Sequence, residues 1–334
     1  MNKADGLVIE SDSEIQLIRR IAQGGMSVVY EALQRGTAGF SKRVAVKMML
    51  TKYTDDQKFL ELFVDEAKLV ADLVHENIVQ THHLGLTEGS NFYIVMEFVE
   101  GISMHEFILH HRLNDIQIPE KLAVHIVSRI ARGLSYAHQA VDRSGNPLNI
   151  VHRDICPSNI MISNEGITKI TDFGVAKAKS NSLNTDKWLT GKVPYMSPEQ
   201  AACRELNFRS DVYSLGAVLF ELLSGRCLRS EDANPREDNF AEIPIPWDLL
   251  PKDTGKTLIG LLEKMLNPDP ECRSVNTNDL AVALEYYIYK DGYGPTIQTV
   301  RDYILETFPN LDFKQPIDEM PASSLISPDA EVDT

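Results

Sequence analysis

Residues 150–174 read I-V-H-R-D-I-C-P-S-N-I-M-I-S-N-E-G-I-T-K-I-T-D-F-G, and this stretch decides the fold. It contains two short apolar segments, 160–162 and 167–170, separated by the turn N-E-G at 164–166. Alternating apolar residues on both sides of a glycine-containing turn predict a β-hairpin. Three polar residues would flank this hairpin, namely Asp154, Asn159 and Asp172.

These three side chains predict a metal site beside a general base. Mg²⁺ prefers oxygen ligands and usually keeps waters and substrate phosphates in its shell. Asn159 and Asp172 can supply protein oxygens, while Asp154 remains to accept a proton from an incoming hydroxyl group. This division of roles indicates phosphoryl transfer.

The order of these residues also matches a known pattern. H-R-D-x-x-x-x-N followed by D-F-G is the catalytic-loop and metal-loop pattern of protein kinases. G-G-M-S-V-V-Y at 24–30 and M-S-P-E-Q at 196–200 are typical of the bacterial style. The chain therefore resembles a eukaryotic-type (Hanks-type) Ser/Thr protein kinase over about residues 15 to 290. A structural turn with a buried ion pair would explain H-R-D alone, but not five motifs in order.

The resemblance implies an α+β, two-lobed protein kinase fold. Residues 14–99 would form the small N-terminal lobe, an antiparallel sheet with one helix, and residues 100–290 the larger, mainly helical lobe of the 14–290 kinase domain. Residues 1–13 are expected to be flexible. A helical extension is expected at 291–315, because apolar residues recur there at helical spacing. The acidic tail at 316–334 is expected to be disordered.

The small lobe would bind ATP. In the kinase pattern a glycine-rich hairpin covers the phosphates, because glycine lets backbone N–H groups approach closely. This chain departs from G-x-G-x-x-G, since Ala22 and Ser27 replace the outer glycines and Gly24 remains. The resemblance assigns ATP contacts to Ile21, Gly24, Gly25, Ser27, Val29, Ala45, Lys47, Met96, Glu97, Val99 and Met161.

Lys47 ends the apolar strand V-A-V-K, and Glu66 lies on the helix that follows. The kinase pattern pairs such a lysine and glutamate, which would hold the lysine against the ATP phosphates. A solvated lysine at a strand end is the plainer alternative. The resemblance favours the Lys47–Glu66 pair as part of the catalytic machinery.

Two positions near the base depart from the Ser/Thr kinase pattern. Cys156 occupies the position that normally carries a lysine, and Lys192 occupies the position after Gly191 that normally carries a threonine. In the family these two side chains meet beside the catalytic aspartate. We therefore expect Lys192 to supply the positive charge that is lost at position 156. Cys156 could also act as a redox switch, although most lone cysteines are small apolar fillers.

The segment between Asp172 and Glu199 is polar and resembles an activation segment. Ser180, Ser182, Thr185 and Thr190 are candidate phosphosites, with Thr185 and Thr190 preferred, and Arg153 could capture a phosphate there. By resemblance, Glu199 pairs with Arg273, and Asp211 anchors the backbone of the catalytic loop. The supporting residues are thus His152, Arg153, Glu199, Asp211 and Arg273.

Composition limits the classes of partner. The net charge of -15 argues against nonspecific binding to nucleic acid or anionic membranes. Four scattered cysteines indicate neither a disulfide framework nor a zinc site, and no apolar run is long enough to span a bilayer. The sequence therefore predicts a soluble, cytoplasmic protein.

The function expected from these features is a serine/threonine protein kinase in signal transduction. It would transfer the γ-phosphate of ATP, with Mg²⁺, to a protein substrate, and self-associate for autophosphorylation. The alternative from another class is a pseudokinase, a scaffold that binds nucleotide without turnover. A small-molecule phosphotransferase is less compatible with the S-P-E motif, which ends a platform for polypeptide substrates.

Overall fold

The computed structural model describes residues 14–87, 91–173, 192–230, 232–235, 238–274 and 276–309. These residues form two compact units. Among the described residues, the first unit consists of 14–60 and 82–98, and the second of 61–81 and those between 99 and 309. Residues 61–81 had been expected in the small lobe, but they group with the second unit.

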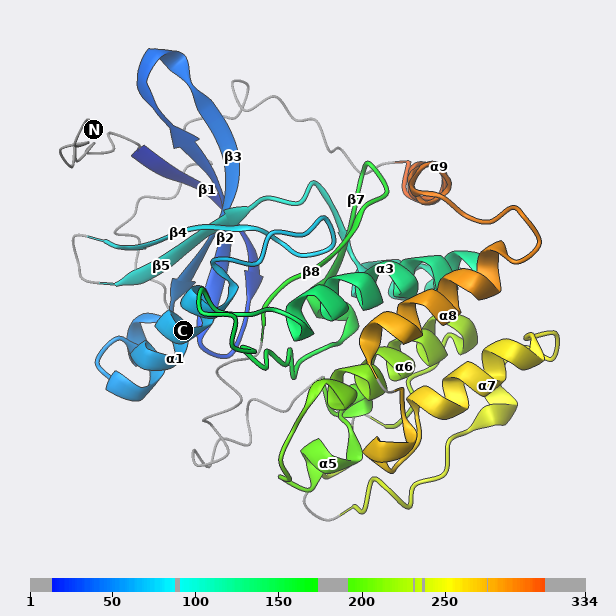
Figure 1. The fold of residues 1–334 in the computed structure, drawn as a ribbon. Helices are drawn as coiled ribbons and strands as arrows, with labels where there is room; N and C mark the ends of the chain where they lie inside the picture. The colour runs from blue at the N-terminus through cyan, green and yellow to red at the C-terminus, as the bar shows by residue number, and fades with distance from the viewer. Residues whose placement is uncertain are drawn as a thin grey trace, which may run out of the picture. The chain divides into compact units, whose positions relative to one another are not determined.

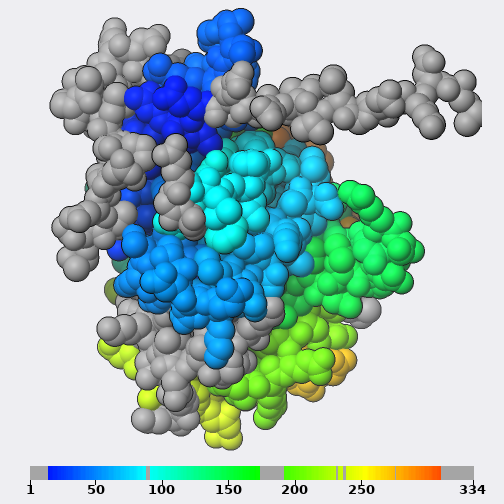
Figure 2. All heavy atoms as spheres, turned by 90° about the vertical axis from the view of Figure 1, so that its left-hand side faces the viewer, coloured from blue at the N-terminus to red at the C-terminus, as the bar shows by residue number. Residues whose placement is uncertain are grey.

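The first unit is built on a five-stranded sheet in the order β1-β2-β3-β5-β4 (Figure 1). The pairs β1–β2, β2–β3 and β3–β5 are antiparallel. On the face shown in Figure 2, the blue residues of β1, β2 and β3 lie together. The strands are β1 (Glu14–Gln23), β2 (Ser27–Arg35), β3 (Ser41–Met49), β4 (Thr81–Leu86) and β5 (Phe92–Glu97).

Apolar residues from the strands form the core of this unit. Leu17, Val28, Val44 and Val95 are buried together on one side of the sheet. Strand β1 is at the edge of the sheet, and its register with β2 shifts twice, once between Leu17 and Arg19 and again between Arg20 and Ala22. The expected sheet-rich unit is confirmed.

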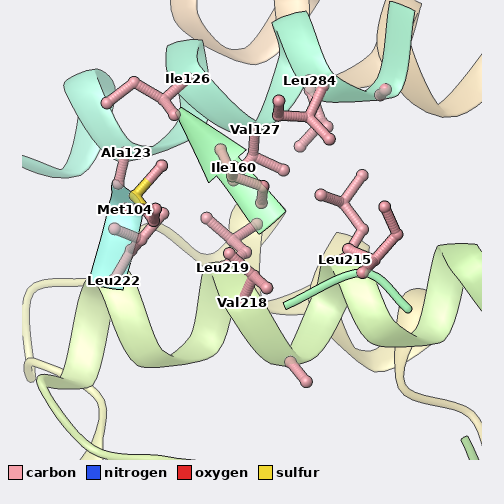
Figure 3. Close-up of a cluster of buried hydrophobic side chains, with 14 of the residues drawn as sticks. Met104, Ala123, Ile126, Val127, Ile160, Leu215, Val218, Leu219, Leu222 and Leu284 are labelled. Atoms are coloured by element: carbon pink, nitrogen blue, oxygen red, sulfur yellow. The ribbon is translucent and has the colours of Figure 1, made fainter. Parts of the chain in front are cut away.

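The second unit is mainly helical. Its helices are α1 (Gln57–Val70, which begins in the first unit), α2 (Met104–Leu113), α3 (Glu120–His138), α5 (Pro198–Ala201), α6 (Phe208–Ser224), α7 (Lys256–Met265), α8 (Thr277–Tyr289) and α9 (Ile297–Thr307). Helix α3 packs against both α6 and α8 (Figure 1). Figure 3 shows Val127 of α3 and Leu219 of α6 pointing into this core, with Ile160 between them. No helix in the described part of the chain is long and apolar enough to cross a membrane.

Local signals account for the ends of α6. The side chain of Asn207 accepts a hydrogen bond from the Arg209 N–H, so the helix begins at Phe208. Gly225 closes the helix in the left-handed conformation with φ 68°, which glycine adopts readily. The side chains in between are buried on nearly every face.

The predicted hairpin is present in the second unit. Strands β7 (Ile160–Ser163) and β8 (Thr168–Ile170) pair antiparallel, and β6 (Gly101–Ser103) extends the sheet on the other side of β7. Gly166 in the turn has φ +87°, which a residue with a side chain rarely adopts.

Helix α9 packs on this turn. A Cβ atom at Gly166 would collide with the backbone of α9 at Ile297 and Arg301. Val300 and Ile304 of α9 are buried in the core of the second unit. Within the extension predicted at 291–315, residues 297–307 form a helix with Phe308 as its C-cap, while residues 310–315 lie outside the described part of the chain.

Candidate active site

The backbone of the catalytic loop is held by Asp211 of α6. One carboxylate oxygen of Asp211 accepts a hydrogen bond from the His152 N–H at 2.7 Å, and the other accepts one from the Arg153 N–H at 2.8 Å. His138 of α3 also contacts this carboxylate, with Nε2 at 2.8 Å from Oδ2. Burial alone would raise the pKa of Asp211, but these hydrogen bonds keep it below its usual value.

His152 joins the catalytic loop to the strand that leads to Asp172. Its Nδ1 accepts a hydrogen bond from the Asp154 N–H at 3.2 Å, so the ring proton lies on Nε2, which donates to the Thr171 carbonyl oxygen at 3.1 Å. The ring is fully buried and lies 4.6 Å from the ring of Phe173 between centroids. Burial lowers the pKa of His152, so the neutral form is favoured and its role is positional.

Asp154 is the acceptor at the centre of the site. Its Oδ2 accepts a hydrogen bond from Asn159 Nδ2 at 3.0 Å and forms an ion pair with Lys192 Nζ. Asn159 Nδ2 also donates to the backbone oxygen of Asp154 at 2.9 Å. The side chain of Asp154 is 8% exposed, so these contacts fix its orientation in a nearly buried environment.

The two predicted metal ligands are on neighbouring segments. The Thr171 N–H donates to the Asn159 carbonyl oxygen at 3.0 Å, which places Asn159 beside the residue that precedes Asp172. Because the amide nitrogen of Asn159 is used on Asp154, its Oδ1 is the atom suited to a cation. Asp172 adopts φ 57°, a conformation uncommon outside glycine and asparagine. One amide and one carboxylate oxygen fit a Mg²⁺ ion that completes its shell with phosphates and waters.

Lys192 is close to both Asp154 and Cys156. Burial alone would lower the pKa of Lys192, but the charge of Asp154, and then that of Cys156, raises it above its usual value. The ammonium group is therefore charged at neutral pH. Cys156 is 2% exposed, so the position that normally carries the family's lysine holds a small buried side chain.

Arg153 is positioned from two sides. Its backbone adopts φ 65°, and its carbonyl oxygen accepts a hydrogen bond from Gln200 Nε2 at 2.6 Å. Its Nε atom is buried without a hydrogen-bond partner among the described residues. The candidate phosphosites Ser180, Ser182, Thr185 and Thr190 lie outside the described residues, so phosphate capture by Arg153 stays a prediction.

A buried ion pair holds Glu199, which ends the polar segment that begins after Asp172. Arg273 NH1 lies 2.7 Å from Glu199 Oε1, and Arg273 NH2 lies 2.9 Å from Oε2, which is a bidentate arrangement. Ser210 donates a further hydrogen bond to Glu199 at 2.7 Å. Burial alone would raise the pKa of Glu199, but the contacts with Arg273 keep it low.

Replacing Arg273 with alanine should lower the free energy of unfolding by on the order of 3–5 kcal/mol. The side chains of Arg273 and Glu199 are 0% and 6% exposed, so the substitution would leave a buried carboxylate without its partner. Urea unfolding monitored by circular dichroism measures the change. Arg143→Ala, in an exposed loop, is the matched control and should change stability little. A loss below about 1 kcal/mol for Arg273→Ala would contradict the prediction.

The residues assigned to ATP lie mostly on the sheet of the first unit. Lys47 of β3 is buried and pairs in register with Val29 of β2 and Ile94 of β5, and Ala45 pairs with Met96. Ile21, Gly24, Gly25, Ser27 and Glu97 belong to the same sheet and its first turn. Val99, Met161 and the buried Glu66 belong to the second unit, so the Lys47–Glu66 pair stays a prediction.

Sequence reasoning missed several residues of this site. The sequence assigns no role to Gln200, His138 or Arg229. In the structure, Arg229 NH1 donates a hydrogen bond to the Met196 carbonyl oxygen at 2.8 Å. Tyr195 donates to Glu221 Oε2 at 2.6 Å. Gln200 was within the motif M-S-P-E-Q, which was its one sequence signal. The described residues contain no group of three or more His, Cys, Asp or Glu side chains arranged to hold a metal ion.

Known proteins resemble this chain along most of its length. The model of the protein kinase domain matches residues 15–282. Tyrosine-protein kinase MasK of Myxococcus xanthus is 36% identical over 283 residues, which cover 81% of this chain and 42% of that protein. Serine/threonine-protein kinase PrkC of Bacillus subtilis is 40% identical over 212 residues, covering 63% of this chain and 30% of that protein.

A third relative and a solved structure agree with this match. Serine/threonine-protein kinase PknA of Mycobacterium tuberculosis is 34% identical over 265 residues, 77% of this chain and 57% of that protein. The chain thus spans 30–57% of the length of these three relatives. The crystal structure of the Mycobacterium tuberculosis PknI kinase domain superposes with a TM-score of 0.61 at 22% identity, covering 83% of this chain and 97% of that one, which shows the shared fold. The protein therefore belongs to the protein kinase domain family, whose members use ATP and a divalent metal ion.

Proposed function

We propose that this chain is a serine/threonine protein kinase that transfers the γ-phosphate of ATP to a hydroxyl group of a protein. The observation that carries the proposal is the arrangement around Asp154. In a chain of the kinase family, this nearly buried carboxylate is held by Asn159 and Lys192 on a loop that Asp211 anchors. The proposed kinase domain spans residues 14–290.

The roles of the residues follow from the groups that they present. The substrate hydroxyl oxygen attacks the γ-phosphorus, its proton passes to the Asp154 carboxylate, and the bond between the γ-phosphorus and the bridging oxygen breaks to release ADP. Asn159 Oδ1 and the Asp172 carboxylate would hold Mg²⁺, which neutralises charge on the phosphates when bound. Lys47, paired with Glu66, would orient those phosphates.

Lys192 has a proposed role in stabilising charge on the transferring phosphoryl group. Its ammonium is paired with Asp154 and lies near Cys156, the position that carries a lysine in most of the family. A cation beside the base stabilises negative charge that develops on the phosphoryl oxygens. The chain would thus keep the usual charge in the site while supplying it from a different segment.

The amino acid that accepts the phosphate is part of the proposal. PrkC and PknA are named serine/threonine kinases, whereas MasK is named a tyrosine kinase. Lys192 replaces the threonine of the Ser/Thr pattern, which weakens the argument against tyrosine, although the overall pattern favours Ser/Thr. We propose Ser/Thr as the main acceptor, and analysis of the phosphorylated amino acids after hydrolysis of the labelled protein distinguishes the two.

The proposal is tested by incubating the full chain with ATP labelled on the γ-phosphate, alone and with a generic basic protein. Label should appear with Mg²⁺ and fall to background when EDTA removes the metal, because the phosphates lose their bridging charge. A rate of self-labelling that rises with enzyme concentration would support autophosphorylation between two molecules. Binding of nucleotide without any transfer of label would instead support the pseudokinase.

A further inference from the structure

A buried cation lies next to the end of the segment that carries Lys192. Arg229, which follows α6 in the chain, is 7% exposed, and no carboxylate in the described part of the chain pairs with its guanidinium group. NH1 donates a hydrogen bond to the Met196 carbonyl oxygen at 2.8 Å. NH2 donates to the Phe240 carbonyl oxygen at 3.2 Å and to the Tyr213 hydroxyl group. A buried charge is costly unless it is hydrogen-bonded, so these three acceptors stabilise the cation in place of a counter-ion.

Two aromatic rings complete the surroundings of this cation. The guanidinium carbon of Arg229 lies 4.4 Å from the ring centroid of Phe240 and 5.2 Å from that of Tyr213. The face of an aromatic ring attracts a cation, and the attraction is stronger where water is excluded. Burial lowers the pKa of Arg229, but a guanidinium group stays protonated in proteins. The ring contacts and the three hydrogen bonds together fix the orientation of this charged group.

The Met196 carbonyl group lies at the end of a short turn. Residues Val193–Tyr195 form this turn, with Lys192 as its N-cap and Met196 as its C-cap. The Tyr195 N–H donates to the Lys192 carbonyl oxygen at 3.2 Å, and the Met196 N–H donates to that of Val193 at 3.2 Å. A 3₁₀ turn of this length has few hydrogen bonds of its own, and their geometry is poor. Its position therefore depends on contacts from outside the turn.

The turn is held at both of its ends. At the start, Lys192 forms the ion pair with Asp154. At the other end, the Met196 carbonyl oxygen accepts the hydrogen bond from Arg229, and the Met196 side chain packs with Phe240 in a small apolar cluster. Arg229 thus fixes the end of the turn that lies opposite the catalytic cation.

We propose that Arg229 is a positioning residue for phosphoryl transfer, which places the Lys192 ammonium beside Asp154 by holding the turn at Met196. The inference rests on the proposed function and deepens it, because it names a residue through which the charge of Lys192 is placed. A lysine side chain is long and flexible, so its ammonium is accurately placed only when the backbone that carries it is fixed. A displacement of about 1 Å can lower the rate of transfer about a hundredfold.

Arg229→Met tests this role, because methionine keeps apolar contact with the two rings but cannot donate a hydrogen bond. The kcat for transfer to a protein substrate should fall by about ten- to hundredfold, while KM for ATP stays the same. Arg229→Lys retains a charged donor for the Met196 carbonyl group and should recover most of the lost kcat. Arg226→Met is the matched control, since Arg226 is exposed on the same connection after α6, and it should leave kcat unchanged.

A double-mutant cycle separates positioning from a general effect on the fold. In Lys192→Thr the group through which Arg229 acts is absent, so adding Arg229→Met should reduce kcat by less than about threefold. The same factor of loss in both backgrounds would show that Arg229 acts independently of Lys192, and it would overturn the proposal. Normal kcat in Arg229→Met would overturn it as well.

Hydrogen exchange tests the placement of the turn without measuring transfer. In the full chain, Arg229→Met should speed exchange of the Tyr195 and Met196 amides by at least about tenfold, the factor expected for a lost hydrogen bond to a charged group. Residues 150–160 of the catalytic loop should exchange as in the wild type, and Arg229→Lys should restore the slower rates. Unchanged exchange at Tyr195 and Met196 would contradict the positioning role, whereas a wild type that transfers no label would contradict the proposed function instead.

Discussion

Asp154→Asn should reduce the rate of phosphoryl transfer by about 10²- to 10⁴-fold, the contribution typical of a general base. Asparagine keeps the shape of the side chain, but it cannot take the substrate proton or pair with Lys192 as a charged group. The hydrogen bond with Asn159 can persist through the remaining oxygen, so the loop should stay folded. The measurement is kcat with saturating ATP, together with the affinity for nucleotide.

Asp291→Asn is the matched control for Asp154→Asn, since Asp291 is exposed and forms a surface ion pair with Lys121. Transfer and nucleotide binding should both be unchanged in the control. In Asp154→Asn, nucleotide binding should be retained while transfer is lost. Normal transfer in Asp154→Asn would remove this residue from the reaction, and loss of both properties would indicate a misfolded site.

Lys192→Thr should reduce transfer by about 10²- to 10³-fold, and adding Cys156→Lys should restore much of the loss. The first change removes the cation beside Asp154, and the second returns a cation to the position used by most of the family. In the structure, Lys192 is paired with Asp154, and the charge of Cys156 raises the pKa of Lys192. Position 156 is thus within electrostatic range of Lys192, as the rescue requires.

The pattern across the variants distinguishes catalysis from stability. Lys264→Thr on the exposed face of α7 is the control and should leave kcat unchanged. Cys156→Lys alone should lower activity, because two ammonium groups would then share one carboxylate. Normal activity in Lys192→Thr, or the absence of any rescue in the double variant, would contradict the proposed role of Lys192 in stabilising charge on the phosphoryl group. Urea unfolding of each variant shows whether a lost activity reflects a lost fold.

Much of the fold could be predicted because its signals are local. The hairpin of β7 and β8 follows from alternating apolar residues around a turn, and Gly225 ends α6 in the conformation that glycine favours. The start of α6 is harder to locate from the sequence, because the cap at Asn207 is a single polar residue outside the apolar pattern. The two-lobed kinase fold came from the order of motifs and is confirmed by the comparisons.

The contacts within the site were less predictable, because they join residues far apart in the sequence. The hydrogen bond of His138 to Asp211, and that of Tyr195 to Glu221, depend on how α3, α6 and the chain before α5 pack together. No periodic pattern marks either pair. The resemblance identified Asp211 and Lys192 as candidate site residues. His138 and Tyr195 lie outside the motifs that the resemblance used.

The contact between α9 and Gly166 determines where an expressed fragment of this chain should end. The family match stops at residue 282, before α9 begins. Protein ended there would lack Val300 and Ile304, and apolar surface on the second unit that these side chains cover would face water. Newly exposed apolar surface promotes aggregation. Recombinant protein for crystallisation or screening should therefore extend at least through Phe308, whatever boundary the family profile suggests.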